Sequence, residues 1–547
     1  MFSWFDFVVF GLFLGLSVFV GVYHALRARF TKFAHSGTDE YLTGGHNLPV
    51  FPVCLLLLTT FISGIALLGV PAEIYLRGAS MGAAHLLGVF AFVFMGIFFI
   101  PMFYKLRPTN VYEYFELRFD SEFLRAIGTG MFILNTSVYM AIVIYAPSIA
   151  LSGAADLPLW PLIIARGMRN VFASAEASGR LSDAIFRFDP SPFQYNNFWV
   201  STVGGMVHAI GMFGLNQMAL QRYCAMPSLR EANIVMGLTV PAHLLVCCMA
   251  MYLGLLIFAF FHGCDPVALG EVSTPDQLSI ILAAQVLGAF PGMLGLFLSC
   301  LFSATLSTIS SGMNSMVGVI YEDVLKSRIP NERHAPLVMK LVVVLLGVLA
   351  TGMAFLCQLL GGILQVVIGT LGATSAPIAG CFFLGIFFPR SNKHGAIVGF
   401  FISSAFMVLV SVLYHMDKPF ELYVLNMQAA DAPAPACLAA NQTQMSALIG
   451  DFYAHKTPDN HYGAPDSMLL SRLSPFAYSF TGIFLTVAIG LLVSWAWPQP
   501  LNEHKKTIAF ACTHQGLKCP LPKLPTSHES ASSTTTAGDE KRKKLLS

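Results

Sequence analysis

Long apolar runs separated by short polar stretches divide most of the chain into segments long enough to cross a membrane. A spanning helix needs about 20 predominantly apolar residues. By that criterion the sequence predicts eleven spanning helices, at 4–26, 48–76, 81–104, 123–150, 196–217, 232–260, 292–320, 337–360, 363–388, 394–415 and 476–497. The pattern therefore predicts an all-α polytopic membrane protein with one multi-pass domain over residues 1–497.

The composition agrees with this assignment. Hydrophobic residues make up 55% of the chain and charged residues 11%, whereas soluble proteins carry about 25% charged residues. The formal net charge of +2 gives no reason to expect a nucleic-acid partner. The last segment, 498–547, is polar and rich in Ser, Thr and Lys, and we expect it to be a disordered cytoplasmic tail.

Basic residues in the loops predict the orientation. With the amino terminus outside, the following clusters all lie on the cytoplasmic side: 27–32, 105–118, 222–230, 326–333, 390–393 and 541–544. We therefore expect a plasma-membrane protein with its carboxyl terminus inside. The sequon at Asn441 then lies outside, in the long loop 416–475, where a glycan can be attached. Cys264 and Cys437 also lie in outer loops, and their pairing stays open because spacing does not give connectivity.

The stretch 151–195 departs from the pattern. It is expected outside, yet it contains Arg166, Arg169, Arg180 and Arg187, and its apolar piece 157–165 is too short to cross. Two interpretations fit: an extracellular subdomain with a surface helix, or a place where a helical hairpin is missing. Loss of a hairpin removes two crossings, so it leaves the orientation of all other helices unchanged.

Polar and flexible residues interrupt the second predicted span near mid-membrane. The run Thr59-Thr60-Phe61-Ile62-Ser63-Gly64 is followed by Gly69 and Pro71. Glycine weakens a helix and proline removes one backbone hydrogen bond. A helix that breaks inside the membrane frees carbonyl groups, which is tolerated only beside a cavity or an ion. The alternative is a kinked helix whose small residues serve packing.

Hydroxyl and amide side chains crowd the seventh predicted span. They occupy seven of the twelve positions from Ser303 to Asn314, a density beyond what bonding to the preceding turn explains. A hard cation prefers a small cage of oxygens. The hydroxyls of Ser307 and Thr308, the carbonyl of Ala304 and the carbonyls of the broken second span predict such a cage. No carboxylate lies in the middle of either segment, which favours a monovalent ion over calcium.

Short motifs are spread over nearly the whole chain. They are Tyr41-Leu42-Thr43-Gly44-Gly45, Leu68-Gly69-Val70-Pro71-Ala72-Glu73-Ile74-Tyr75, Tyr145-Ala146-Pro147-Ser148-Ile149-Ala150-Leu151, Gly214-Leu215-Asn216-Gln217, Gln221-Arg222-Tyr223, Cys264-Asp265-Pro266, Pro275-Asp276-Gln277-Leu278, Pro291-Gly292-Met293-Leu294-Gly295-Leu296-Phe297 and Thr305-Leu306-Ser307-Thr308. Together these motifs resemble those of the sodium/solute symporters, in the branch with the sodium-coupled monocarboxylate, multivitamin and iodide transporters.

The resemblance implies a fold of two inverted five-helix repeats with flanking helices, and binding sites at the membrane midplane. Sodium is then expected as the coupling ion, with no other cofactor. The implied sodium ligands are the carbonyls near Thr59 and Ile62, the carbonyl of Ala304 and the hydroxyls of Ser307 and Thr308. The solute is expected to face Ser63, Ala66, Leu67, Tyr139 and Phe213.

Two departures from the family pattern bear on function. The fifth helix of the first repeat and most of the fourth are absent near residue 165, which favours the missing-hairpin interpretation. Ala66 and Ala209 stand where relatives place larger or polar side chains, which leaves the solute open. We expect sodium-coupled symport of a small organic anion such as a monocarboxylate. The alternatives are a truncated, non-transporting isoform and a vitamin or iodide transporter. No nucleophile–base pair suggests an enzyme.

Overall fold

The computed structural model describes residues 4–30, 48–106, 108, 110–152, 160–288, 290–329, 334–357, 363–426, 442–457 and 460–499. Within these ranges the chain is helical and contains no strand. The first half contains α1 (Trp4–Phe30), α3 (Val50–Phe61), α4 (Gly64–Arg77), α5 (Gly82–Leu87), α6 (Val89–Leu106), α7 (Glu113–Phe119), α8 (Glu122–Ser152), α9 (Trp160–Ala177), α10 (Ser182–Ile185), η3 (Val200–Gly204), α11 (Gly205–Ala209), η4 (Ile210–Gly214), α12 (Gln217–Cys224) and α13 (Leu229–Phe260).

The second half of the chain is also helical in the described ranges. It contains η5 (Pro275–Gln277), α14 (Leu278–Leu287), α15 (Met293–Ile320), η6 (Tyr321–Leu325), α16 (Ala335–Cys357), α17 (Ile363–Val366), η8 (Val367–Leu371), α18 (Gly372–Phe387), α19 (Lys393–Asp417), α20 (Gln442–Ala454), η10 (Leu470–Arg472), η11 (Pro475–Ala477) and α21 (Tyr478–Ala496).

Each of the eleven predicted spans coincides with a helix or a chain of helices. Nine helical stretches among the described residues are long and apolar enough to cross a membrane, and the bent pair α3–α4 makes a tenth. The predicted span at 196–217 is the shorter apolar helix Val200–Gly214, built from η3, α11 and η4. The protein is therefore a multi-pass membrane protein. The tail from residue 500 onward and Asn441 lie outside the described residues.

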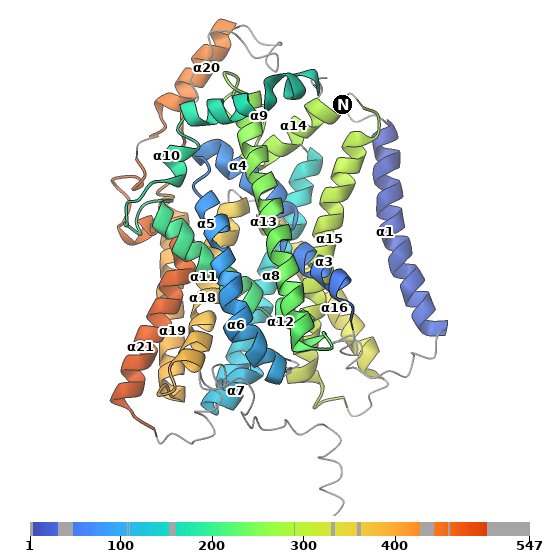
Figure 1. Ribbon diagram of the computed structural model, residues 1–547, viewed down its shortest axis with the longest axis vertical. Helices are drawn as coiled ribbons and strands as arrows, with labels where there is room; N and C mark the ends of the chain where they lie inside the picture. The colour runs from blue at the N-terminus through green and yellow to red at the C-terminus, as the bar shows by residue number, and fades with distance from the viewer. Residues whose placement is uncertain are drawn as a thin grey trace, which may run out of the picture.

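The irregular stretch after α8 contains a helix that does not qualify as a candidate membrane span. α9 has 18 residues but includes Arg166, Arg169 and Glu176, and it is not among the candidate spans. It lies across the upper end of the bundle, beside α13 and α14 (Figure 1). A surface helix therefore joins α8 to η3, where the family resemblance predicts two spanning helices.

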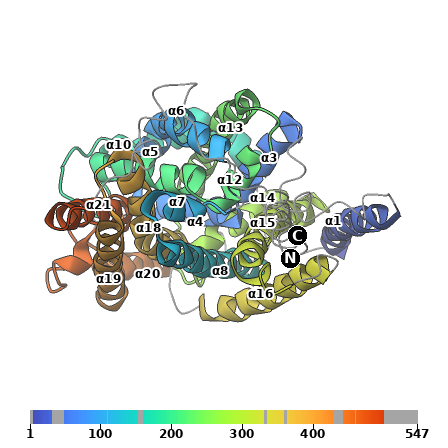
Figure 2. The same ribbon diagram turned by 90° about the horizontal axis from the view of Figure 1, so that it is seen from below.

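The bundle separates into a central group and two flanks. α3, α4, α6, α8, α13 and α15 form the centre, and α18, α19 and α21 pack together at one side (Figures 1 and 2). α1 stands at the opposite side and packs against α15. α9, α14 and α20 lie at one end of the bundle and α7 at the other. The largest hydrophobic cluster runs through the central group.

Candidate functional site

A break in the second span is the structural centre of the site. α3 ends at Phe61, α4 begins at Gly64, and the two axes are bent by 52°. The last α3 bond joins the Ile62 N–H to the Leu58 carbonyl at 3.0 Å, and the next turn begins where the Ala66 N–H reaches the Ser63 carbonyl at 3.0 Å. The final carbonyls of a helix have no partner in a following turn. The break therefore makes the carbonyls of residues 59–62 available to other groups.

The break occurs at Ile62–Ser63, and Gly69 and Pro71 lie within α4 rather than at the break. Ser63 takes an extended conformation, and its hydroxyl accepts a hydrogen bond from the Ile65 N–H, as an N-cap residue does. Proline cannot donate to the carbonyl four residues earlier. That carbonyl, of Leu67, instead accepts a hydrogen bond from the Ser279 hydroxyl of α14 at 3.2 Å. The helix can therefore continue through Pro71.

The hydroxyls of α15 face the last turn of α3. The Thr308 hydroxyl lies 3.1 Å from the Thr59 carbonyl oxygen and 3.2 Å from the Ala304 carbonyl oxygen. The Ser307 hydroxyl donates to the Thr59 hydroxyl at 3.0 Å. Thr308 is fully buried. Four of the five residues predicted to bind sodium thus meet across the α3–α15 interface, and the fifth, Ile62, is the first residue of the break.

The buried guanidinium of Arg222 lies one turn further along this interface. Ser311 of α15 accepts hydrogen bonds from the Thr60 hydroxyl at 3.1 Å and from the Arg222 guanidinium at 2.7 Å. Arg222 belongs to α12 and also donates to the Met218 carbonyl. The three side chains are at most 8% exposed. They connect α3, α15 and α12 in one hydrogen-bonded group.

A cavity of about 130 Å³ lies beside the break. Its wall includes Phe61 of α3, two residues beyond Thr59, and Tyr139 of α8. The polar groups that line it come from α8, the Val200–Gly214 helix and its end, α18 and α21: Asn135, Thr136, His208, Asn216, Ser375 and Ser479. None of the described residues that line it is Asp, Glu, Lys or Arg. The cavity can therefore hold a small solute by uncharged hydrogen bonding and apolar contact.

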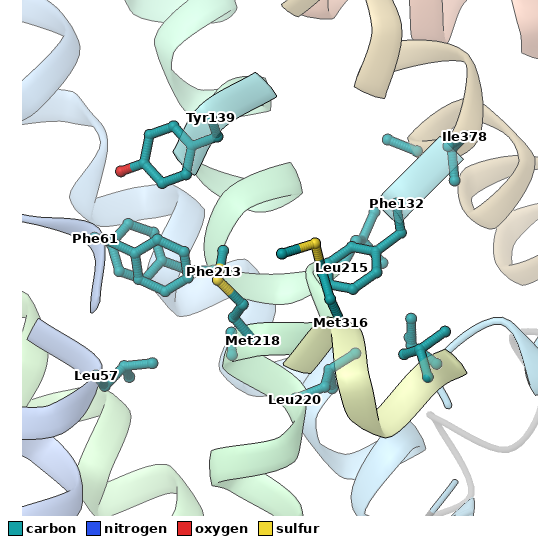
Figure 3. Close-up of a cluster of buried hydrophobic side chains, with 14 of the residues drawn as sticks. Leu57, Phe61, Phe132, Tyr139, Phe213, Leu215, Met218, Leu220, Met316 and Ile378 are labelled. Carbon is teal, nitrogen blue, oxygen red and sulfur yellow. The ribbon is translucent and has the colours of Figure 1, made fainter. Parts of the chain in front are cut away.

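Of the five residues predicted to face the solute, the structure places only Tyr139 on the wall of the cavity. Tyr139 lines the cavity, and its side chain also interacts with the Ser63 side chain at the break. Phe213 is buried against Phe61, with ring centroids 4.5 Å apart (Figure 3), and it is not among the residues that line the cavity. Ser63, Ala66 and Leu67 belong to the break and the first turn of α4 and do not line this cavity.

Several lining residues were not predicted to contact the solute. His208 is one histidine in a glycine-rich helix, and the structure places its Nδ1 3.4 Å from the Ser479 hydroxyl. Ser375 and Ser479 lie in α18 and α21, far along the chain from the broken helix. A single serine in an apolar span carries no sequence signal, because such hydroxyls usually bond to the preceding turn.

Cys264 forms a disulfide bond. Seven other cysteines in the described part of the chain carry free thiols, namely Cys54, Cys224, Cys247, Cys248, Cys300, Cys357 and Cys381. The partner of Cys264 therefore lies outside the described residues, as does Cys437.

The chain matches the family model described as "Sodium:solute symporter family" over residues 41–169 and 164–403. The two matching stretches overlap at 164–169. This is the place where the sequence departs from the family pattern and where α9 lies.

Similar proteins are found among curated sequences. The chain is 30% identical to a sodium-coupled monocarboxylate transporter 1 of Xenopus laevis, over 90% of this chain and 85% of that protein. It is also 30% identical to the human sodium-coupled monocarboxylate transporter 1, over 89% of this chain and 86% of that one. A sodium-dependent multivitamin transporter of Oryctolagus cuniculus is equally similar, at 30% identity over 90% of this chain and 82% of that one.

Among solved structures, the fold resembles that of a Na+-coupled sialic acid symporter in a substrate-bound outward-open state. The TM-score is 0.69 at 19% identity, over 92% of this chain and 100% of that chain. At this identity the likeness concerns the fold alone, and it agrees with the inverted-repeat transporter fold predicted from the sequence. Together with the family model and the relatives that span most of the chain, it shows that this protein belongs to the sodium:solute symporter family.

Proposed function

We propose that this protein couples sodium influx to the uptake of a small organic anion of the monocarboxylate class across the plasma membrane, with its amino terminus outside and its carboxyl terminus in the cytoplasm. The observation that carries the proposal is the contact between the broken second span and α15. There the carbonyl of Thr59 and the hydroxyls of Ser307 and Thr308 gather at one point.

Sodium would bind by replacing the hydrogen bonds that now join these groups. The Thr308 hydroxyl would turn a lone pair to the ion, as would the carbonyls of Thr59, Ile62 and Ala304 and the hydroxyl of Ser307. An oxygen cage of this kind suits a hard cation. Because its ligands come from α3 and α15, the ion would favour the arrangement in which the two helices are joined, and so the solute-binding state.

The cavity supports a small solute with few polar atoms. Its uncharged donors, such as Asn135, His208 and Ser479, can orient a carboxylate, while the co-transported sodium compensates its charge. The membrane potential supplies about 2.3 kcal/mol per elementary charge per 100 mV to drive the ion inward. Most of the similar proteins described above are named as monocarboxylate transporters, which favours that solute class over vitamins.

Uptake of radiolabelled lactate, nicotinate, iodide and biotin, with and without sodium, tests this proposal. We expect sodium-dependent uptake of lactate or nicotinate by the wild type and its loss in the double variant Ser307→Ala/Thr308→Ala. Ser310→Ala is the matched control, because Ser310 is an exposed hydroxyl on the same helix. Equal uptake by the double variant and Ser310→Ala, at equal surface expression, would refute the sodium site.

A second candidate function is that of a non-transporting isoform with a regulatory role. Two observations favour this candidate: the two family matches overlap at 164–169, and the surface helix α9 lies there. Both fit a chain that lacks two helices of the first repeat. Inserting a hairpin from a relative between α8 and α9 separates the two candidates. Uptake that appears only after the insertion supports the regulatory role, whereas uptake by the natural chain supports transport.

A further inference from the structure

We propose that His85, His243 and Cys247 form a binding site for one soft transition-metal ion, with Cu+ preferred over Zn2+. His85 lies on α5, and His243 and Cys247 lie one turn apart on α13. One ring nitrogen of each histidine and the Cys247 sulfur all lie within 4.8 Å of one another. This cluster is separate from the α3–α15 interface that we assign to sodium.

The three ligand atoms are arranged nearly as in a metal site and need to move only a short distance closer together. The His243 Nε2 and Cys247 Sγ atoms are 3.5 Å apart. Two ligands of a tetrahedral ion, bound at about 2.0 Å for nitrogen and 2.3 Å for sulfur, are separated by about that distance. The His85 ring lies with its centroid 6.3 Å from that of His243. A rotation of the His85 side chain toward α13 would complete three-fold coordination.

A buried nitrogen atom of His85 without a partner supports the assignment. His85 Nε2 and His243 Nδ1 are buried and have no hydrogen-bond partner among the described residues. Leaving a buried polar atom unsatisfied costs about 1–3 kcal/mol. An ion held by His85 Nε2, His243 Nε2 and Cys247 would give the His85 nitrogen a partner, whereas His243 Nδ1 faces the apolar neighbours Phe92 and Phe213.

The ligand types and the charge balance favour Cu+. Thiolate and thioether ligands select Cu+ and zinc, and a further sulfur lies one turn away on the same face of α13. This is Met251, whose methyl group would lie 3.1 Å from a Cβ placed on Gly82 of α5. One thiolate and two neutral imidazoles make a neutral complex with Cu+ but a net +1 complex with Zn2+, and an uncompensated charge inside the membrane is costly.

The electrostatic neighbours of the cluster are other histidine and cysteine side chains. His208 interacts with His85, and Cys248 with Cys247, and among the described residues no carboxylate interacts with this cluster to compensate a second positive charge. His208 also lines the central cavity, so the cluster has a neighbour on the cavity wall. Binding forms one Cu–S and two Cu–N bonds and releases the Cys247 thiol proton to water.

The test measures Cu+ affinity of the purified full-length protein against bicinchoninate under anaerobic conditions. We expect Cys247→Ser, His243→Gln and His85→Gln each to weaken Cu+ binding by about tenfold to a hundredfold. Cys248→Ser is the matched control and should bind like the wild type. X-ray absorption of the one-to-one complex should show one sulfur and two imidazole nitrogens around copper.

Three results would overturn the proposal: equal Cu+ affinity in Cys247→Ser and the wild type, an equal loss in Cys248→Ser, or Zn2+ bound more tightly than Cu+. Thermal unfolding without copper shows whether each variant folds. His85→Gln lies on a different helix from the other two substitutions, so it keeps the proposal testable if an α13 variant does not fold.

Discussion

The Thr308 hydroxyl donates to the Thr59 carbonyl oxygen at 3.1 Å, and this contact joins α15 to the last turn of the broken span. Thr308 also lies 3.2 Å from the Ala304 carbonyl oxygen of its own helix. A single hydroxyl therefore lies between two carbonyls from different helices. If the Thr308 O–H turned away and left a lone pair facing this point, a small cation there would meet three oxygens at once.

Thr308→Val tests the importance of that hydroxyl, since valine keeps the shape and removes the oxygen. We expect the sodium concentration for half-maximal uptake to rise by about tenfold to a hundredfold, because an interaction with a charged group contributes about 1.5–3 kcal/mol. Thr308→Ser keeps the hydroxyl and should stay within a few-fold of the wild type. Sodium titrations of solute uptake provide the measurement, and an unchanged sodium dependence in Thr308→Val would contradict the site.

Glu113 gives the end of the bundle at α7 a dependence on pH. It lies outside the spans, near Arg125 at 3.8 Å, and also faces Glu322 and Asp323. Burial is the main cause that raises the pKa of Glu113 from 4.5 to about 7. The folded state then holds a proton that the unfolded state releases, so stability is fully present below about pH 4.5 and is lost as the pH rises through about 7.

Thermal unfolding of the wild type and of Glu113→Gln between pH 5 and 8 measures this effect. We expect the wild type to lose up to about 3 kcal/mol over this range and Glu113→Gln to lose clearly less. Glu122→Gln replaces an exposed carboxylate in the first turn of α8 and should follow the wild type. Parallel curves for Glu113→Gln and the wild type would show that Glu113 is not the titrating group.

The contact between Asp6 and α15 holds α1 against the bundle. The Asp6 carboxylate accepts hydrogen bonds from the N–H groups of Gly292 at 2.9 Å and Gly295 at 3.2 Å. A Cβ on Gly295 would overlap the Asp6 backbone carbonyl. Gly295→Ala should therefore displace the start of α1, whereas Gly11→Ala should not, because a Cβ there meets open space.

Disulfide cross-linking measures this displacement. A cysteine pair introduced at Phe10 and Phe302, whose rings lie 5.1 Å apart, should cross-link in the Gly11→Ala background. The yield should fall several-fold in the Gly295→Ala background. Equal yields in both backgrounds would mean that α1 tolerates the added methyl group without moving.

Arg180 holds the segment after α9 against the loop 418–426. Its buried guanidinium donates to the carbonyls of Tyr75 at 2.8 Å, Leu425 at 2.8 Å and Asn426 at 3.1 Å, and it lies 4.0 Å from the centroid of the Phe258 ring. Arg180→Gln leaves several of these buried carbonyls without a donor. We expect a loss of about 3 kcal/mol or more in stability.

The melting temperature of the detergent-solubilised protein checks this expectation. Arg187→Gln is the control, because Arg187 is only partly buried and its contacts are longer, 3.3 Å to the Tyr423 hydroxyl and 3.5 Å to the Asn196 carbonyl. Its cost should stay within about 0.5–1.5 kcal/mol. Similar melting temperatures for the two variants would show that Arg180 does not anchor the segment.

The helices were predictable because membrane insertion depends on length and hydropathy, which are local properties of the sequence. Each predicted span coincides with a helix or a chain of helices, although Val200–Gly214 is shorter than the candidate spans. The position of the break was less predictable. Gly69 and Pro71 suggested a break that the Ser279–Leu67 hydrogen bond makes unnecessary, and a partner more than 200 residues away is invisible in a local pattern.

The sequence by itself determined that this chain crosses the membrane many times and which family it resembles, and it predicted which two segments offer oxygens to a cation. Only the tertiary structure decided that Thr59 and Thr308 touch, that Tyr139 rather than Phe213 lines the cavity, and that His85 meets Cys247. The physical reason is that residue type specifies what a group can bind, whereas the packing of helices distant along the chain specifies which groups are close enough to bind the same ligand.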